Sequence, residues 1–132
     1  MKKLLLTIIL CLSFALPTFA ENFVEIHADD FEIRYLDLDS IKLIKNDNRE
    51  FYSYKEKTLN KENKDISLQL VYLDWPGRHI TAVQTFLYNE KGEETFASEL
   101  SKNPEWHPLG DIPEFRQLLQ DKYLPLLTKH AK

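Results

Sequence analysis

The chain has 132 residues, of which 43% are hydrophobic and 29% are charged, with 17 basic against 21 acidic side chains. This length suits a single domain with one hydrophobic core, and the acidic balance argues against nucleic acid or anionic lipid as the partner. The chain contains one cysteine, Cys11, which excludes an internal disulfide and a site built from several cysteine ligands.

The first 20 residues have the pattern of a secretory signal peptide. Lys2 and Lys3 precede an apolar run over 4–16, and small residues lead to a cleavage point after Ala20. The apolar run is shorter than the ~20 residues that a membrane-spanning helix needs. We therefore expect an exported protein, located in the periplasm, at the cell surface or outside the cell. Its mature domain, 21–132, has no cysteine and makes no stable membrane insertion.

The N-terminal half of the mature domain predicts two hairpins. Alternating apolar and polar residues over 23–36 indicate an opening hairpin, and a second is expected over 41–59 with its turn at 46–48. The return strand, 49–59, has no wholly apolar face, so we expect its far half to be solvated or at a sheet edge. The polar run 60–65 is predicted to be a loop.

The clearest pattern lies over 66–96. Two apolar strands joined by a Pro-Gly turn, with a third strand after a Glu-Lys-Gly turn, predict an antiparallel meander. Apolar residues on both faces of these strands indicate a central ribbon that is covered on both sides. Gly77, Gly92 and Gly110 all fall in predicted turns, where a positive φ is often needed.

A helix is predicted to begin near Asp111, which can cap it and form a capping box with Glu114. Pro125 is expected to kink the helix or to end it near Tyr123. The predicted fold is therefore α+β, an antiparallel β-sheet meander of about five to six strands with a C-terminal amphipathic helix on one face. The residues that form the apolar stripe of this helix are Phe115, Leu118, Leu119, Tyr123, Leu126 and Leu127.

A series of short motifs runs through 22–127: Asp-x-x-Ser-Ile, a tyrosine-rich strand, Tyr-x-x-x-Gly, a Trp-x-Pro connector and a helix opened by Ile-Pro. They lie at Asp37, Ser40, Ile41, Tyr88, Gly92, Trp106, Pro108, Ile112 and Pro113. Their order resembles the surface-adhesin protein E family of small exported bacterial domains. The resemblance implies an antiparallel sheet with a packed helix and binding to host extracellular-matrix and plasma proteins. The chain departs from the family in lacking the cysteines of many members and in having Phe23 where Trp is usual.

No residue pattern predicts catalysis, a metal or a cofactor. Asp37, Asp39 and Ser40 crowd oxygen atoms as a calcium loop does, but the glycine and closing glutamate of such a loop are missing, and a cap or turn role explains them better. The adjacent acids Glu93 and Glu94 fit a solvated hairpin tip, and the serines lack a nucleophile signature. The histidines are not spaced as metal ligands on one element: His27, His79, His107 and His130.

Five aromatic residues are candidate binding residues, because Tyr and Trp dominate the binding energy of protein interfaces. Core packing is the alternative explanation for most of them. They are Tyr52, Tyr54, Tyr72, Trp75 and Trp106.

Three functions remain open. The first is a non-enzymatic exported binding module of the cell envelope or surface, adhesin-like by resemblance, with a protein partner. The second is an envelope structural or assembly protein whose partner comes from the same cell, a second copy of the chain included. The third is a small envelope ligand carrier or hydrolase, which would need a pocket that gathers His79 or His107 with carboxylates.

Overall fold

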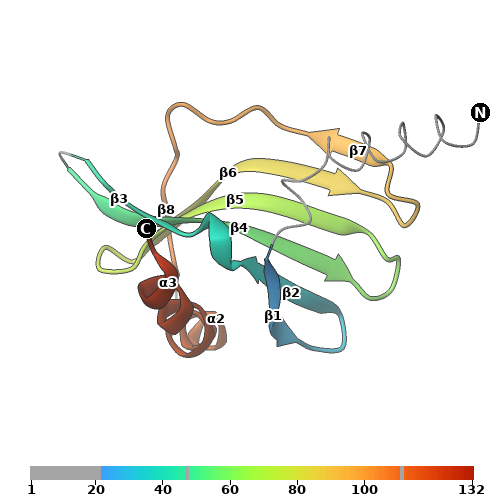
Figure 1. The fold of residues 1–132 in the computed structure, drawn as a ribbon, viewed down its shortest axis with the longest axis horizontal. Coiled ribbons are helices and arrows are strands. Elements are labelled where there is room, and N and C mark those ends of the chain that lie inside the picture. Colours follow the sequence, from blue (N-terminus) through green and yellow to red (C-terminus); the bar gives the residue numbers. More distant parts are fainter. Residues whose placement is uncertain (1–21, 47, 111) are drawn as a thin grey trace, which may run out of the picture.

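The computed structural model describes residues 22–46, 48–110 and 112–132. These residues form an antiparallel sheet with one helical segment packed against it (Figure 1). The proposed signal segment, 1–20, lies outside the described residues. None of the helices in the described part is long and apolar enough to cross a membrane.

The described residues form eight strands in one open sheet. The strand order is β1-β2-β4-β5-β6-β7, while β3 pairs with β4 and β8 pairs with β6. The predicted α+β class is confirmed, with eight strands where about five to six were expected. Strand β8, which pairs with β6, had no counterpart in the predicted elements. The bounds are β1 Phe23–Ala28, β2 Glu32–Asp37, β3 Lys42–Lys45, β4 Glu50–Asn60, β5 Ile66–Asp74, β6 His79–Tyr88, β7 Glu94–Ala97 and β8 His107–Pro108.

Strand β4 is central, which contradicts the prediction that its far half is solvated or at an edge. Residues 56–60 of β4 pair with β2, residues 50–53 pair with β3, and residues 52–59 pair with β5 on the other side. Both hairpins predicted in the N-terminal half are present, as β1–β2 and β3–β4. Glu56 of β4 contacts Tyr123 and Arg34 on other elements, so its polarity did not indicate an edge.

Strands β5, β6 and β7 form the predicted meander. The turn glycines differ in what they require. Gly92 and Gly110 have φ values of 82° and 74°, as expected for turns that need a left-handed residue. Gly77 does not lie in that region; instead, a Cβ at this position would collide with the carboxylate of Asp74. Position 77 therefore requires glycine because the Asp74 side chain approaches the backbone closely.

One helical segment covers part of one sheet face. It consists of α2 (Pro113–Leu118), a π-helical turn η3 (Leu119–Tyr123) and α3 (Leu124–His130). The helix therefore continues past Tyr123. Of the two alternatives predicted for Pro125, an end near Tyr123 is wrong, and a π-helical turn interrupts the regular α-helix just before the proline. The N–H of Leu124 donates to the carbonyl oxygen of Leu119, and this wider turn makes room for a proline ring that would clash in a regular α-helix. Asp111, the predicted cap, lies outside the described residues.

The main core lies between this helical segment and the sheet. Leu119, Tyr123 and Leu127 are buried, and Phe115, Leu118 and Leu126 pack beside them, which confirms the predicted apolar stripe. At the C-terminus, Lys132 exchanges backbone hydrogen bonds with Ile41 and Leu43, so the chain end lies along β3. The other buried residues of this core are Ile26, Leu36, Ile41, Tyr54, Val71, Leu73 and Leu109.

Candidate functional site

The five predicted aromatic residues lie on two faces of the sheet. Neighbouring residues of a strand point to opposite faces, and Tyr54 packs on the helix side, where its ring centroid lies 5.9 Å from that of Tyr123. Tyr52 and Trp75 also pack against the core on this side. Tyr72 and Trp106 stack together on the opposite face. One continuous surface formed by all five is therefore not present.

Tyr54 cannot contribute to a binding surface in the folded protein. Its side chain has no exposed area, and its hydroxyl is buried without a hydrogen-bond partner. Burial raises the pKa of Tyr54 well above its ordinary value. For this residue, core packing is the correct one of the two explanations that its sequence context allowed.

Tyr72 and Trp106 belong to a packed aromatic group on the face away from the helix. The ring centroid of Phe51 lies 4.7 Å from that of Tyr72 and 5.2 Å from that of Trp106. The Arg49 guanidinium lies 4.3 Å from the Trp106 ring centroid and forms a 2.9 Å ion pair with Asp74. These contacts hold the connector before β8 onto the sheet, so the group has a structural role that explains both residues.

Tyr52 and Trp75 remain as members of an open site. They line an apolar pocket of about 220 Å³ at the end of the sheet where the β3–β4 and β5–β6 turns project beside α3 (Figure 1). Leu43 comes from β3, Leu73 from β5 and Leu124 from α3. The full lining is Leu43, Glu50, Phe51, Tyr52, Leu73, Trp75, Pro76, Leu124 and Thr128.

A second hollow shares Trp75 with this pocket. It has a volume of about 300 Å³ and is lined by Trp75, Arg78, Pro113, Arg116, Gln117 and Gln120. The Arg78 guanidinium lies 4.0 Å from the Trp75 ring centroid, and its Nη1 donates to the Trp75 carbonyl oxygen at 3.0 Å. We call the apolar pocket and this arginine hollow together the Trp75 site.

The backbone at Arg78 is unusual. Its φ is 57°, a left-handed conformation that costs a residue other than glycine about 1–2 kcal/mol. The N–H of Arg78 donates to the Trp75 carbonyl oxygen at 3.1 Å, and its own carbonyl oxygen accepts from Leu109 at 2.9 Å. This conformation holds the guanidinium against the indole. Strained residues of this kind concentrate at functional sites.

The two arginines of the Trp75 site were not among the residues predicted from sequence. The sequence Trp75-Pro-Gly-Arg78 could have predicted the contact of Arg78 with Trp75. A tight turn brings its first and fourth residues together, and arginine stacks on tryptophan. Arg116 had no comparable signal, since it lies 38 residues further along the chain and only helix packing brings it near Trp75.

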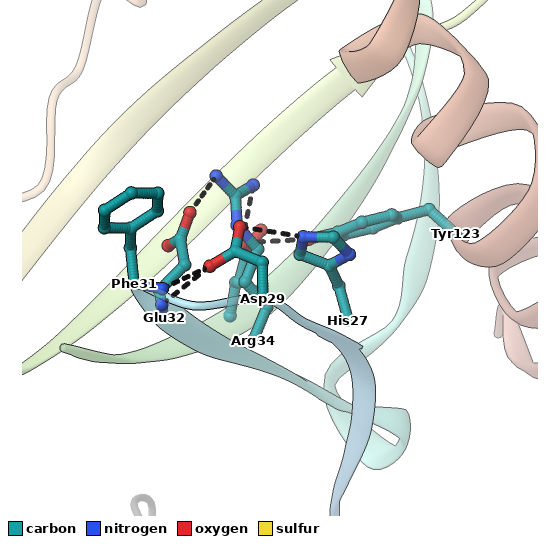
Figure 2. Close-up of polar contacts among 7 residues, drawn as sticks. His27, Asp29, Phe31, Glu32, Arg34 and Tyr123 are labelled. Carbon is teal, nitrogen blue, oxygen red and sulfur yellow. Dashed lines mark hydrogen bonds and ion pairs between the residues drawn. The ribbon is translucent and has the colours of Figure 1, made fainter. Parts of the chain in front are cut away.

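A buried polar cluster of Tyr123, Glu56 and Arg34 connects the helical segment to the sheet (Figure 2). Tyr123 reaches from η3 and donates its hydroxyl to Oε1 of Glu56 at 2.9 Å. Arg34 of β2 forms ion pairs with Glu56 at 3.5 Å and with Glu32 at 3.2 Å. Glu56 is only 8% exposed. The cluster joins three elements that are distant in sequence, and its contacts are those of a structural link.

A turn borders this cluster. His27 and Asp29 approach each other at 3.3 Å (Figure 2). Oδ1 of Asp29 accepts the backbone N–H groups of Phe31 and Glu32 at 2.8 and 2.9 Å. These two hydrogen bonds lower the pKa of Asp29. The aspartate therefore closes the β1–β2 turn.

Replacing Glu56 with glutamine should flatten the dependence of stability on pH. Burial raises the pKa of Glu56 above its ordinary value of 4.5, although Arg34 and the Tyr123 hydroxyl hold back part of the rise. A raised carboxyl pKa means that the folded state binds the proton more tightly than the unfolded state, so stability falls as pH increases above about 4.5. Urea denaturation from pH 4.5 to 7 should show wild type losing stability relative to Glu56→Gln. A constant difference would contradict this.

The three residues whose oxygen atoms crowd together in the sequence, Asp37, Asp39 and Ser40, form a turn. Asp37 caps a 3₁₀ helix, Leu38–Ser40, by accepting the N–H of Asp39 at 3.1 Å. The Ser40 hydroxyl donates to the Asp37 carbonyl oxygen at 2.7 Å and accepts the Lys55 N–H at 2.8 Å. Within the described ranges, no three His, Cys, Asp or Glu side chains gather closely enough to hold a metal ion.

The histidines that a carrier or hydrolase would need do not line the hollows described above. His79 lies opposite Asp74 in the β5–β6 register, and His107 pairs with Ile80 at the start of β8. The Trp75 site instead combines aromatic, aliphatic and guanidinium groups at one end of the sheet.

Searches of protein-family models, curated proteins and solved structures found no match to this chain.

Proposed function

We propose that this chain is an exported, non-enzymatic protein-binding module of the bacterial cell envelope or surface, with the Trp75 site as its contact surface. The observation that supports this most strongly is the open apolar pocket between Tyr52 and Trp75. Small-molecule sites usually enclose about 300–1,000 Å³, whereas this pocket of about 220 Å³ suits a single anchoring side chain. Anchors seated in such pockets supply much of the binding energy of protein interfaces.

The residue types of the site also fit protein binding. Trp, Tyr and Arg are the residues most enriched among those whose truncation weakens protein complexes, and the Trp75 site contains Trp75, Tyr52, Arg78 and Arg116. The signal pattern at the N-terminus supports export. The resemblance to surface-adhesin protein E domains supports a protein as the partner.

A second candidate is an envelope assembly protein that binds a same-cell partner by strand addition. The observation that favours it is β7, a short strand at one end of the sheet order whose four residues are all exposed. Phe96 in this strand is 51% exposed. An exposed edge strand can pair with a strand from another chain.

Replacing Trp75 with alanine should weaken partner binding about 30-fold, the effect of losing an interface residue worth ~2 kcal/mol. The full chain is expressed in its own cells, partners are captured by crosslinking, and the affinity of each purified partner is measured. Phe96→Ala serves as the matched control, because it removes an exposed aromatic ring on β7. Circular dichroism confirms that both variants are folded at the temperature of the assay.

The two variants distinguish the two candidates. If only Trp75→Ala loses binding, the Trp75 site is supported as the contact surface. If only Phe96→Ala loses binding, the β7 edge is supported instead. Equal partner recovery by wild type and Trp75→Ala would overturn the proposal that this site is the contact surface.

A further inference from the structure

We infer that a separate hollow, at the end of the sheet opposite the Trp75 site, binds a neutral saccharide. This hollow has a volume of about 340 Å³ and is lined by residues of the β1–β2 and β4–β5 turns and of the ends of β6 and β7 (Figure 1). We call it the Phe31 site. It shares no lining residue with the Trp75 site, so the inference is independent of the proposed function.

The floor of the Phe31 site is a row of three side chains on neighbouring strands. Thr58 pairs with Ser67, and Ser67 pairs with Leu87, in the register of the sheet. They lie on the face that carries the helical segment, because Thr58 is two residues from Glu56, whose carboxylate contacts Tyr123. The hydroxyl groups of Thr58 and Ser67 make no hydrogen bond to another described residue. They are therefore free to bind a ligand.

The β4–β5 turn supplies amide groups of fixed orientation. Oδ1 of Asn60 accepts the backbone N–H groups of Glu62 and Asn63 at 2.9 and 3.2 Å. Oδ1 of Asn63 accepts the N–H of Asp65 at 2.9 Å. These hydrogen bonds orient both side chains before a ligand binds, and the NH₂ group of each amide remains as a donor. The carboxylate of Asp65 adds an acceptor to the same lining.

Phe31 gives the site an aromatic wall. Its side chain is 77% exposed, and Figure 2 shows the ring standing at the β1–β2 turn beside Glu32. The Phe31 N–H donates to Asp29 at 2.8 Å, and its carbonyl oxygen accepts the Lys61 N–H at 2.9 Å, so the two turns are joined. An exposed aromatic ring on a turn that is held in this way is a surface on which the C–H face of a sugar can stack.

The combination of groups matches a neutral ligand with many hydroxyl groups. A sugar unit has hydroxyls that both donate and accept hydrogen bonds, together with apolar C–H faces. The site offers amide donors, hydroxyl groups, the Asp65 acceptor, and apolar surface from Phe31 and Leu87. Its volume of about 340 Å³ falls within the range of about 300–1,000 Å³ that small-ligand sites enclose.

The charges of the lining argue against the two ionic alternatives. Among the described residues that line the site, Glu32 and Asp65 are acidic and none is basic, which disfavours a phosphate, a sulfate or an acidic peptide. A cationic side chain of a partner protein also fits less well than a sugar. Glu32 already forms an ion pair with Arg34 at 3.2 Å, and amide NH₂ groups are donors that a cation cannot use.

Binding to an array of defined ligands tests the inference. The exported protein, purified from cells that express the full chain, is applied to immobilised oligosaccharides, both neutral and acidic. Fragments of bacterial envelope glycans and of animal cell-surface glycans are scored separately, and short lysine-rich and arginine-rich peptides represent the cationic alternative. Each saccharide that binds is then titrated free in solution by calorimetry, and shifts of backbone amide signals in NMR spectra locate its site.

Two variants remove different parts of the site. Phe31→Ala removes the aromatic wall, and Thr58→Val/Ser67→Ala removes the hydroxyl groups of the floor. Leu100→Ala is the control, because it truncates an apolar side chain that is 49% exposed and lies outside the lining of the site. Circular dichroism confirms that each variant is folded at the temperature of the assay.

We expect wild type and Leu100→Ala to bind neutral saccharides with equal affinity, with the amide shifts concentrated over 60–67 and at Phe31. Phe31→Ala and the hydroxyl double variant should each bind about tenfold more weakly, as expected for the loss of an aromatic contact or of hydrogen bonds. Neutral saccharides from either source would support the inference, and the source would identify the natural ligand.

Four results would overturn the inference. They are the absence of saccharide binding at millimolar concentration, unchanged affinity in either site variant, amide shifts located away from the Phe31 site, and a preference for cationic peptides or acidic saccharides. None of these results bears on the Trp75 site, which Trp75→Ala tests separately.

Discussion

Replacement of Tyr123 with alanine is expected to lower the free energy of unfolding by about 3–5 kcal/mol, the usual effect of truncating a buried aromatic side chain. Tyr123 is 1% exposed, packs its ring against Tyr54 and donates its hydroxyl to Glu56. A domain of this size has about 5–15 kcal/mol of total stability. The loss should appear in urea denaturation as a lower transition midpoint.

The variant Tyr123→Phe separates the hydroxyl from the ring. It keeps the packing against Tyr54 but leaves the buried Glu56 without its hydroxyl donor, so we expect a smaller loss of about 1–3 kcal/mol. The difference between the two variants measures the cavity that the ring would leave. If Tyr123→Ala lost less than about 1 kcal/mol, the described packing of the helix on the sheet would be contradicted.

Replacement of Arg34 with methionine is expected to cost about 3 kcal/mol at pH 7, because it leaves the carboxylate of Glu56 buried without its cationic partner. The two side chains approach to 3.5 Å, and Glu56 is nearly buried. Methionine keeps an apolar stem in place of the arginine stem, so most of the loss reports on charge. Glu32, the second partner of Arg34, is more exposed and contributes less.

The cost of Arg34→Met should depend on pH. Burial already raises the pKa of Glu56, and Arg34 opposes that rise, so removing Arg34 raises the pKa further. Near pH 4.5 Glu56 can bind a proton in the folded variant and the penalty shrinks, whereas at pH 7 ionisation has its full cost. Urea denaturation at the two pH values measures the change.

The double variant Arg34→Met/Glu56→Gln is the control for this pH dependence. It removes the buried charge together with its partner, and so it should recover part of the stability at pH 7 and show a flatter pH profile. Equal losses for Arg34→Met at both pH values would show that the ion pair with Glu56 is not the source of its stability.

Local patterns predicted most of the secondary structure correctly. The hairpins, the meander over 66–96 and the apolar stripe of the helix depend on residues that are near each other in sequence, where alternation and helical spacing act directly. The prediction that the far half of β4 is solvated or at an edge was wrong for a tertiary reason. Glu56 of β4 is buried in contact with Tyr123 of the helical segment. At Pro125, a π-helical turn keeps the helix continuous, so of the two alternatives predicted there the end of the helix is the one that was wrong.

The candidate site was predicted only in part. Tyr52 and Trp75 were identified by residue type, and both line the apolar pocket. Residue type could not separate them from Tyr54, which is buried, because whether a tyrosine is exposed depends on what packs over its strand. The helix from the end of the chain covers Tyr54 through Tyr123 and leaves a pocket beside Tyr52.

The sequence by itself determined the α+β class and the order of the elements, because these follow from periodicity over a few residues. Only the tertiary structure decided which aromatic residues are accessible and which charges meet. Arg34 and Glu56 are brought together by strand pairing, and Tyr123 joins them by helix packing across 67 residues. Arg116 reaches the hollow beside Trp75 in the same way. Such contacts are set by the assembled core, and no local pattern records them.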